Sequence, residues 1–253
     1  MRGKQCTSRE RVPISPCFSL DDPNASGCLR LPVAPACNIQ CGFCSRTFDL
    51  GEELQGLSLT PEAAVEEVRS RIERGERVSS VVVSGPGEPL ANAATFVVLR
   101  QLNCLFPELL LGISTNGLLL RDRLEQVVAD GVRSVAITIS AFWPETAKRV
   151  YSRILYKGRR YSLEDAAEFL LRNQWQGMML AVDAGLHVTV NGVFSPGVNE
   201  GDIPLIAEKA GQYGARAMHI LPAPGEGLKD GAMPDEKALA ALREKCRSFF
   251  EDR

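Results

Sequence analysis

Short apolar runs alternate along the chain with longer stretches in which apolar positions recur every three to four residues. The short runs predict strands, and the longer stretches predict amphipathic helices. Strands are expected at 31–34, 80–84, 109–114, 134–140, 187–193 and 217–221. Because a helical stretch follows each strand, the pattern predicts βαβ units around one parallel sheet.

Helices are expected at 61–74, 92–104, 119–130, 144–151, 163–184, 202–213 and 234–250. The first of them has clear boundary signals: Thr60 as N-cap, Pro61 at the first helical position and Gly75 as the stop. Six repeats predict an α/β fold with a partial (β/α)6 barrel rather than the full eight-fold barrel. We expect residues 31–253 to form this barrel and residues 1–30 to form an irregular N-terminal arm.

Composition and charge exclude several classes of partner. The 253 residues include 29 Lys and Arg against 31 Asp and Glu, so the formal net charge is −2. This balance argues against nucleic acid as a partner. No apolar run reaches the roughly 18 residues of a membrane span. The polar N-terminus does not resemble a secretory signal, so a cytoplasmic protein without a membrane partner is expected.

Cysteine is unevenly distributed: six of the eight cysteines lie within the first 44 residues. In a cytoplasmic chain this bias favours metal ligation over disulfides. Cys37, Cys41 and Cys44 form a Cys-x3-Cys-x2-Cys loop directly after the first predicted strand. Three thiolates suit a [4Fe-4S] cluster with one iron free of protein ligands. The alternative is a structural zinc ion that takes Cys28 or Cys17 as its fourth ligand.

The cysteine loop, with Phe43 directly before its last cysteine, resembles the signature of the radical S-adenosylmethionine (SAM) superfamily. The resemblance implies a [4Fe-4S] cluster whose open iron binds the amino and carboxylate groups of SAM. One-electron reduction then cleaves SAM to methionine and a 5′-deoxyadenosyl radical. A reductant such as ferredoxin or flavodoxin is implied as a partner.

Residues at the ends of the later strands extend this resemblance. Gly85 and Gly87 allow a ligand to approach the backbone closely, and with Glu88 they resemble the family's Gly-Gly-Glu region, which meets the SAM amino group. The remaining cofactor contacts implied are Ser114 and Asn116 after the third strand, Ser140 after the fourth, Asn191 near the ribose and Leu221 near the adenine. Taken singly, each of these segments is equally typical of a turn or a helix cap.

The resemblance narrows to the NifB family of radical SAM maturases, which build the iron–sulfur precursor of the nitrogenase cofactor. It covers roughly residues 13–225. The family's His-Pro-Cys segment corresponds to Ser15-Pro16-Cys17, which retains only the cysteine. Cys17 is therefore the candidate ligand of a second cluster, and Glu53 matches a family acidic residue; we assign both to the catalytic set. Cys104 is expected to be a buried core thiol.

These patterns predict a radical SAM enzyme, a lyase- or transferase-type maturase acting in biosynthesis of a nitrogenase-type iron–sulfur cofactor. A protein that donates or accepts iron–sulfur clusters is a further expected partner. Two alternatives stay open: a radical SAM enzyme acting on an organic or peptide substrate, and a non-catalytic cluster carrier. The basic run 157–160, within a tyrosine-containing insertion, is a candidate contact for an anionic cluster or an electron donor.

Overall fold

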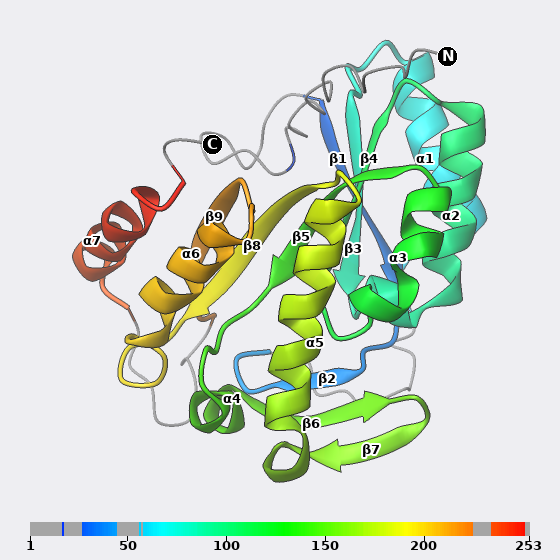
Figure 1. The fold of residues 1–253 in the computed structure, drawn as a ribbon. Coiled ribbons are helices and arrows are strands. Elements are labelled where there is room, and N and C mark those ends of the chain that lie inside the picture. Colours follow the sequence, from blue (N-terminus) through cyan, green and yellow to red (C-terminus); the bar gives the residue numbers. More distant parts are fainter. Residues whose placement is uncertain (1–16, 18–26, 45–55, 57, 225–233, 251–253) are drawn as a thin grey trace, which may run out of the picture.

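The computed structural model describes residues 17, 27–44, 56, 58–224 and 234–250 (Figure 1). Its main sheet has six parallel strands in the order β1-β3-β4-β5-β8-β9. These strands are Cys28–Ala34, Ser80–Pro86, Leu110–Thr115, Val132–Thr138, His187–Phe194 and Ala217–Pro222. Within the described residues, β1 and β9 are the two edges and do not pair. The predicted partial barrel is therefore confirmed.

Helices line the outer face of the curved sheet in Figure 1. They are α1 (Pro61–Glu73), α2 (Ala93–Leu105), α3 (Leu120–Ala129), α4 (Pro144–Val150), α5 (Leu163–Asp183), α6 (Asp202–Gln212) and α7 (Glu236–Arg247). All seven fall where the apolar spacing predicts them. The hydroxyl of Thr60 accepts a hydrogen bond from the N–H of Ala63, and Pro61 takes the first helical position, as the capping signals indicate. None of the described helices is long and apolar enough to cross a membrane.

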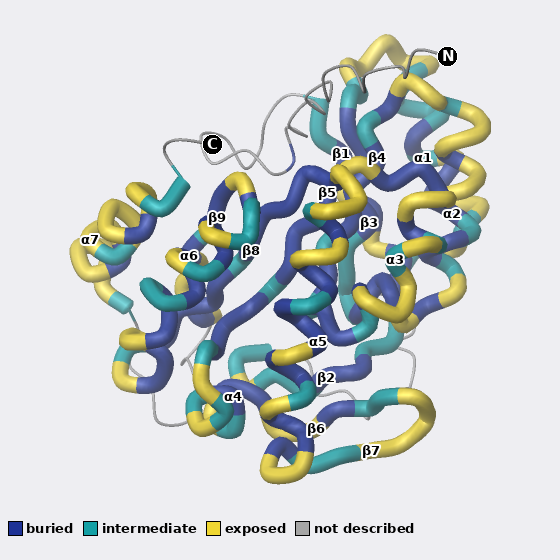
Figure 2. Tube along the Cα trace, in the orientation of Figure 1, coloured by how far each residue is buried: buried dark blue, intermediate teal, exposed yellow. Residues whose placement is uncertain are grey.

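The strands alternate between a helix-covered face and a concave face. On β1, Leu29, Leu31 and Val33 are buried in the core, whereas Arg30 and Pro32 are exposed on the opposite side (Figure 2). Burial of the outward residues of every strand beneath the helices supplies the main driving force for this fold. The opposite, concave face is more polar than the helix-covered face. Because the strands are parallel, their carboxyl ends lie along one edge of this face.

A second, three-stranded sheet of β2 (Ile39–Cys41), β6 (Tyr151–Tyr156) and β7 (Arg159–Ser162) was not predicted. The strand β2 is only three residues long and pairs antiparallel with β6, more than 100 positions away. Neither strand of the β6–β7 hairpin has strict apolar alternation, so the hydrophobic pattern gave no signal. This small sheet joins the cysteine loop to the insertion between β5 and α5.

Cys17 and Cys28 form a disulfide, so the expectation of metal ligation before disulfides is wrong for this pair. Cys17 is 2% exposed and packs against Val82 and Ala136 on the concave face. Cys28 begins β1 and Ala34 ends it, which places the disulfide about 20 Å along the strand from the cysteine loop. The structure thus contradicts the second-cluster role of Cys17, and it also removes the fourth ligand from the zinc alternative.

Cys104 is exposed on α2 rather than buried, which corrects the expectation of a core thiol. The apolar face of α2 uses Val98, Leu99 and Leu102 instead. The division into residues 1–30 and 31–253 stays a prediction, because most of the N-terminal segment lies outside the described residues.

The disulfide predicts a redox-dependent stability. Its sequence separation is 11 residues, for which loop closure in the unfolded chain corresponds to about 3 kcal/mol. Urea unfolding should therefore show a loss of roughly this size when a reductant is added to the metal-free chain. The Cys28→Ser variant should have the lower free energy of unfolding even without reductant, and adding the reductant should not change that value. Equal stability of the oxidised, reduced and substituted chains would contradict the pairing.

Candidate active site

The cysteine loop leaves the carboxyl end of β1 and is fixed by hydrogen bonds to β6 and to Val150, the last residue of α4. The N–H of Gly42 donates to the carbonyl of Val150 at 2.8 Å, and the N–H of Leu155 donates to the carbonyl of Asn38 at 2.8 Å. The N–H of Cys44 closes a turn onto the carbonyl of Cys41 at 3.1 Å. The backbone between the first and last cysteines is therefore held by the insertion as well as by the barrel.

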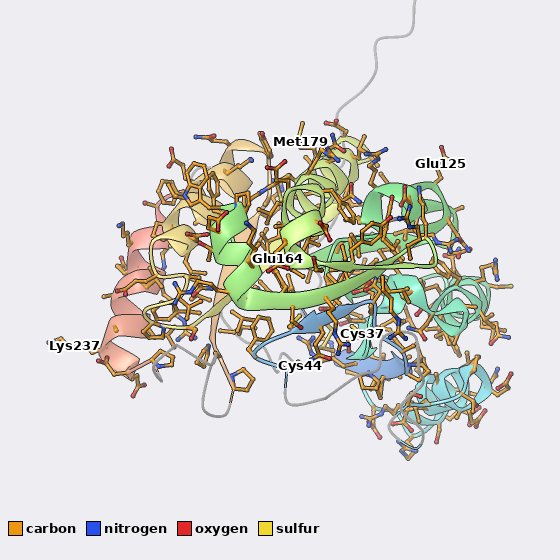
Figure 3. The ribbon with its side chains drawn as sticks, turned by 90° about the horizontal axis from the view of Figure 1, so that it is seen from below. Cys37, Cys44, Glu125, Glu164, Met179 and Lys237 are labelled. Atoms are coloured by element: carbon orange, nitrogen blue, oxygen red, sulfur yellow. A yellow bond between two sulfur atoms is a disulfide. The ribbon has the colours of Figure 1, made fainter. Side chains whose placement is uncertain are left out.

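The three thiols of this loop are free and partly buried, and Figure 3 shows Cys37 and Cys44 close together beside the hairpin. Burial raises the pKa of Cys37 to about 12, with smaller contributions from the charges of Glu88 and Cys44. Burial, followed by the neighbouring Cys37 and Cys44 thiolates, also raises the pKa of Cys41 well above its ordinary value. In the metal-free chain, ionisation of the Cys37 and Cys41 thiols is therefore opposed by burial and by repulsion between neighbouring negative charges.

This donor set fits an iron–sulfur cluster better than a single metal ion. Among the residues that the structure describes, no three His, Cys, Asp or Glu side chains are arranged to hold one metal ion. A [4Fe-4S] cluster has a different requirement, because its cysteine ligands bind different irons. Three free thiols on one loop meet that requirement, and the positive charge of the irons would relieve the repulsion that disfavours thiolates here.

The end of β3 closes tightly onto the segment that precedes the cysteine loop. The N–H groups of Gly87 and Glu88 donate to the carbonyls of Ala34 at 2.6 Å and Ala36 at 2.9 Å. A Cβ atom on Gly87 would lie 2.0 Å from the carbonyl oxygen of Ala36, so only glycine fits at this position. The group that approaches Gly87 closely is the chain's own backbone, and the expected approach of a ligand stays a prediction.

Asn92, directly before α2, adds hydrogen bonds to the junction between the end of β3 and the segment before the cysteine loop. Its side-chain oxygen accepts the N–H of Ala36 at 3.2 Å, and its amide nitrogen donates to the carbonyl of Ala36 at 2.8 Å. The same nitrogen donates to the carbonyl of Glu88 at 2.7 Å. One buried side chain therefore fixes the residue directly before Cys37 relative to β3. Sequence reasoning missed Asn92, whose only signal was an N-cap residue type before a helix.

Glu88 is buried beside the cysteine loop, with 2% of its surface exposed. Its carboxylate accepts hydrogen bonds from Leu90 N–H at 3.0 Å, Thr115 Oγ1 at 2.5 Å and Asn116 N–H at 2.6 Å. Burial raises the pKa of Glu88 to about 7, and these three donors oppose the rise. Glu88 therefore braces the end of β3 against the end of β4, while its expected contact with SAM stays a prediction.

Asn116 links the end of β4 to the cysteine loop. Its amide nitrogen donates to Asn38 Oδ1 at 2.7 Å, and its Oδ1 caps the following turn by accepting Leu118 N–H at 3.1 Å. From α5, Gln174 Nε2 donates to the carbonyls of Asn116 at 2.8 Å and Thr138 at 3.2 Å. The predicted residue Asn116 is thus next to the cluster loop, and Gln174 is a support that the sequence did not reveal.

The sheet register brings the other predicted residues onto the concave face. Asn191 is paired with Thr138 on β5 and with His219 on β9, and all three are partly exposed. Leu221 lies two residues beyond His219 and is 43% exposed. Asn191 and Leu221 therefore share the face on which Ser114, also partly exposed, lies on β4. A ligand above the carboxyl ends of the strands would meet this row of side chains, all of them polar except Leu221.

Ser140 has a different environment from the one expected. It is fully buried, and its hydroxyl accepts the N–H of Val193 at 3.0 Å. Its own N–H donates to Tyr151 Oη at 3.2 Å, and its carbonyl accepts from Asn199 at 2.8 Å. These bonds tie β5, β6 and β8 together behind the concave face. The partly exposed hydroxyl of β5 belongs to Thr138, the last residue of that strand, whereas Ser140 lies two residues beyond its end.

Of the other predicted residues, Phe43 is partly buried and packs against the core beside the cysteine loop. A Cβ atom on Gly85 would lie 3.7 Å from the backbone nitrogen of Gly87, which is an ordinary van der Waals contact, so Gly85 is less restricted than Gly87. Glu53 lies outside the described residues.

A family comparison agrees with this geometry: residues 31–210 match the radical SAM superfamily, and the chain belongs to that family. Its curated relatives include the FeMo cofactor biosynthesis protein NifB. The chain is 35% identical to NifB of Klebsiella pneumoniae over 249 residues, which are 94% of this chain and 53% of that protein. It is 29% identical to NifB of Methanocaldococcus infernus over 241 residues, covering 93% of this chain and 80% of that protein. The chain spans about half the length of most such relatives.

Solved structures with low sequence identity share the fold. Streptococcus suis SuiB superposes with a TM-score of 0.66 at 16% identity, covering 90% of this chain and 47% of that one. The enzyme anSMEcpe, solved with bound AdoMet, gives a TM-score of 0.58 at 15% identity, covering 89% of this chain and 60% of that one. Both comparisons support the partial-barrel architecture.

The junction at Gly87 predicts a sharp contrast between two neighbouring substitutions. Gly87→Ala should force the Ala36 carbonyl away from β3 and lower the free energy of unfolding by roughly 2–4 kcal/mol, the range of overpacked or strained sites. Gly85→Ala is the matched control, with an expected change below about 1 kcal/mol. Urea unfolding of the metal-free variants measures both values. Equal tolerance of the two substitutions would contradict the contact.

Proposed function

We propose that this chain is a radical SAM enzyme acting in FeMo cofactor biosynthesis, as its NifB relatives are named to do. The observation that carries the proposal is the three-thiol loop, fixed on one side by β6 and on the other by Asn92 and Gly87. A bound [4Fe-4S] cluster with SAM would supply the reductive cleavage that yields a 5′-deoxyadenosyl radical.

The chain's own residues would hold and orient these groups. Cys37, Cys41 and Cys44 would ligate the cluster, and Asn38 and Asn116 keep the loop next to the strand ends. Glu88 keeps the ends of β3 and β4 in register. The partly exposed side chains of Ser114, Thr138, Asn191, His219 and Leu221 would contact SAM on the concave face.

We further propose the finer expectations: lyase- or transferase-type maturation, reduction by a ferredoxin or flavodoxin, exchange of clusters with a carrier protein, and a cytoplasmic location. We do not include a second cluster among them, because Cys17, its expected ligand, is held in a disulfide far from the loop. That observation favours a second candidate function, in which the chain uses one cluster to modify an organic or peptide substrate.

Anaerobic reconstitution tests the proposal. We expect about four irons per chain for the SAM cluster alone, and distinctly more if the chain also holds cofactor-precursor clusters. With dithionite and SAM, the wild-type chain should produce 5′-deoxyadenosine. Cys41→Ala should reduce both the iron content and the 5′-deoxyadenosine yield to background, because the cluster would lose one of its three cysteine ligands.

Cys104→Ala is the matched control, since Cys104 is exposed on α2 and is expected to leave iron content and SAM cleavage unchanged. Production of 5′-deoxyadenosine by Cys41→Ala at the wild-type level would contradict the assignment of the loop. Iron content of about four per chain, with active SAM cleavage, would favour the organic-substrate candidate over the cofactor maturase.

A further inference from the structure

The side chain of Asn38, inside the cysteine loop, has a hydrogen-bond donor that the protein itself does not use. Asn38 follows Cys37 directly and is 3% exposed. Its Nδ2 atom is buried and donates no hydrogen bond within the part of the chain that the structure describes. Because a buried amide N–H without an acceptor costs free energy, this group requires an explanation.

The hydrogen bonds around Asn38 fix which way its amide is turned. Asn116 Oδ1 accepts the N–H of Leu118 at 3.1 Å, and Asn116 Nδ2 faces Asn38. Since that nitrogen can only donate, Asn38 has to present its oxygen, which lies 2.7 Å away. Turning the Asn38 amide over would place two donors face to face. The link between the two asparagines therefore uses the oxygen of Asn38 and leaves its nitrogen directed elsewhere.

The unused donor belongs to the segment that surrounds the first cysteine of the loop. The thiol of Cys37 donates to the carbonyl of Ile39, with sulfur and oxygen 3.3 Å apart, so the sulfur is turned back over residues 38 and 39. Burial raises the pKa of Cys37, and backbone hydrogen bonds of Ile39 and Asn38 partly offset that rise. The sulfur of Cys37 therefore lies beside Asn38.

Asn38 has little freedom to turn its donor toward another partner. Its carbonyl accepts the N–H of Leu155 on β6 at 2.8 Å, and its side chain is held by Asn116 at the end of β4. The next residue, Ile39, is buried in the core. The donor is thus fixed in place by the protein before any group binds, as expected of a preorganised contact.

We propose that Asn38 Nδ2 donates a hydrogen bond to a sulfur of the iron–sulfur cluster, either Cys37 Sγ or an adjoining sulfide, and so raises the reduction potential of the cluster. The inference rests on the proposed function, in which the three-cysteine loop holds a [4Fe-4S] cluster. On reduction the reductant loses one electron and the cluster gains it, with no bond made or broken. The sulfurs of the reduced cluster are more negative and accept this hydrogen bond more strongly, so the bond favours the reduced form.

A redox titration of the reconstituted chain, without SAM, tests the effect on the potential. Asn38→Leu is similar in size but has no donor. We expect the equilibrium constant for its reduction to fall about tenfold, which is about 59 mV for one electron. Asn116→Leu is the matched control, because it breaks the same asparagine link and leaves the Asn38 donor in place. Its equilibrium constant should stay within about twofold of the wild-type value.

Two results of this titration would overturn the inference. An equal fall in both variants would assign the effect to the position of the loop rather than to the donor. An unchanged potential in Asn38→Leu would show that the donor does not act on the cluster.

A second measurement can be decided on the wild-type chain alone. The chain is produced with asparagine that carries ¹⁵N only at its side-chain amide, and its reduced cluster is examined by pulsed electron paramagnetic resonance without SAM. We expect a ¹⁵N coupling that Asn116→Leu retains and Asn38→Leu loses. Its absence from wild type would overturn the inference, even if Asn38→Leu assembles no cluster. A coupling that appears only after SAM is added would also overturn it and assign the donor to the SAM carboxylate.

Failure of the hydrogen bond and failure of the proposed function give different results. If wild type holds a cluster but yields no 5′-deoxyadenosine with dithionite and SAM, the proposed function fails, while the potential and the ¹⁵N coupling still decide the hydrogen bond. If wild type cleaves SAM but shows neither the coupling nor a dependence of the potential on Asn38, the inference fails alone. A wild-type chain that assembles no cluster would overturn both.

Discussion

The contact between Gly87 and the carbonyl of Ala36 is the constraint on which the rest of the site depends. It joins the end of β3 to the residue before Cys37, and Asn92 fixes the same residue by both its N–H and its carbonyl. Because the backbones approach so closely, the cysteine loop has one position relative to the strand ends. Glu88 and Asn116 extend this junction to β4, so that three strand ends and the loop form one hydrogen-bonded unit.

This arrangement explains how thiols that resist ionisation can serve as cluster ligands. Burial and mutual repulsion oppose the thiolate forms of Cys37 and Cys41 while no metal is bound. Binding of iron would reverse that balance, so that folding of the loop and metal binding support each other. The β6 strand contributes from the other side, which gives the insertion a structural role at the site.

The sequence predicted the regular elements well, because buried parallel strands and amphipathic helices have strong local patterns. All six main strands and seven helices lie where apolar spacing placed them. Prediction from the sequence failed for two tertiary contacts: β2 pairs with β6 across more than 100 residues, and Cys17 forms a disulfide with Cys28. In the site, the family motif identified the cysteines, but it did not separate the buried Ser140 from the partly exposed Thr138, because Ser140 is buried by hydrogen bonds to residues distant in the sequence.

The central claim is that the three-cysteine loop holds a cluster with one iron open to SAM. Pulsed electron paramagnetic resonance of the reduced, reconstituted chain with SAM labelled by ¹⁵N at its amino group tests this directly. We predict a ¹⁵N hyperfine coupling to the cluster that is absent with unlabelled SAM. A cluster signal with no coupling, and unchanged by addition of SAM, would contradict the claim.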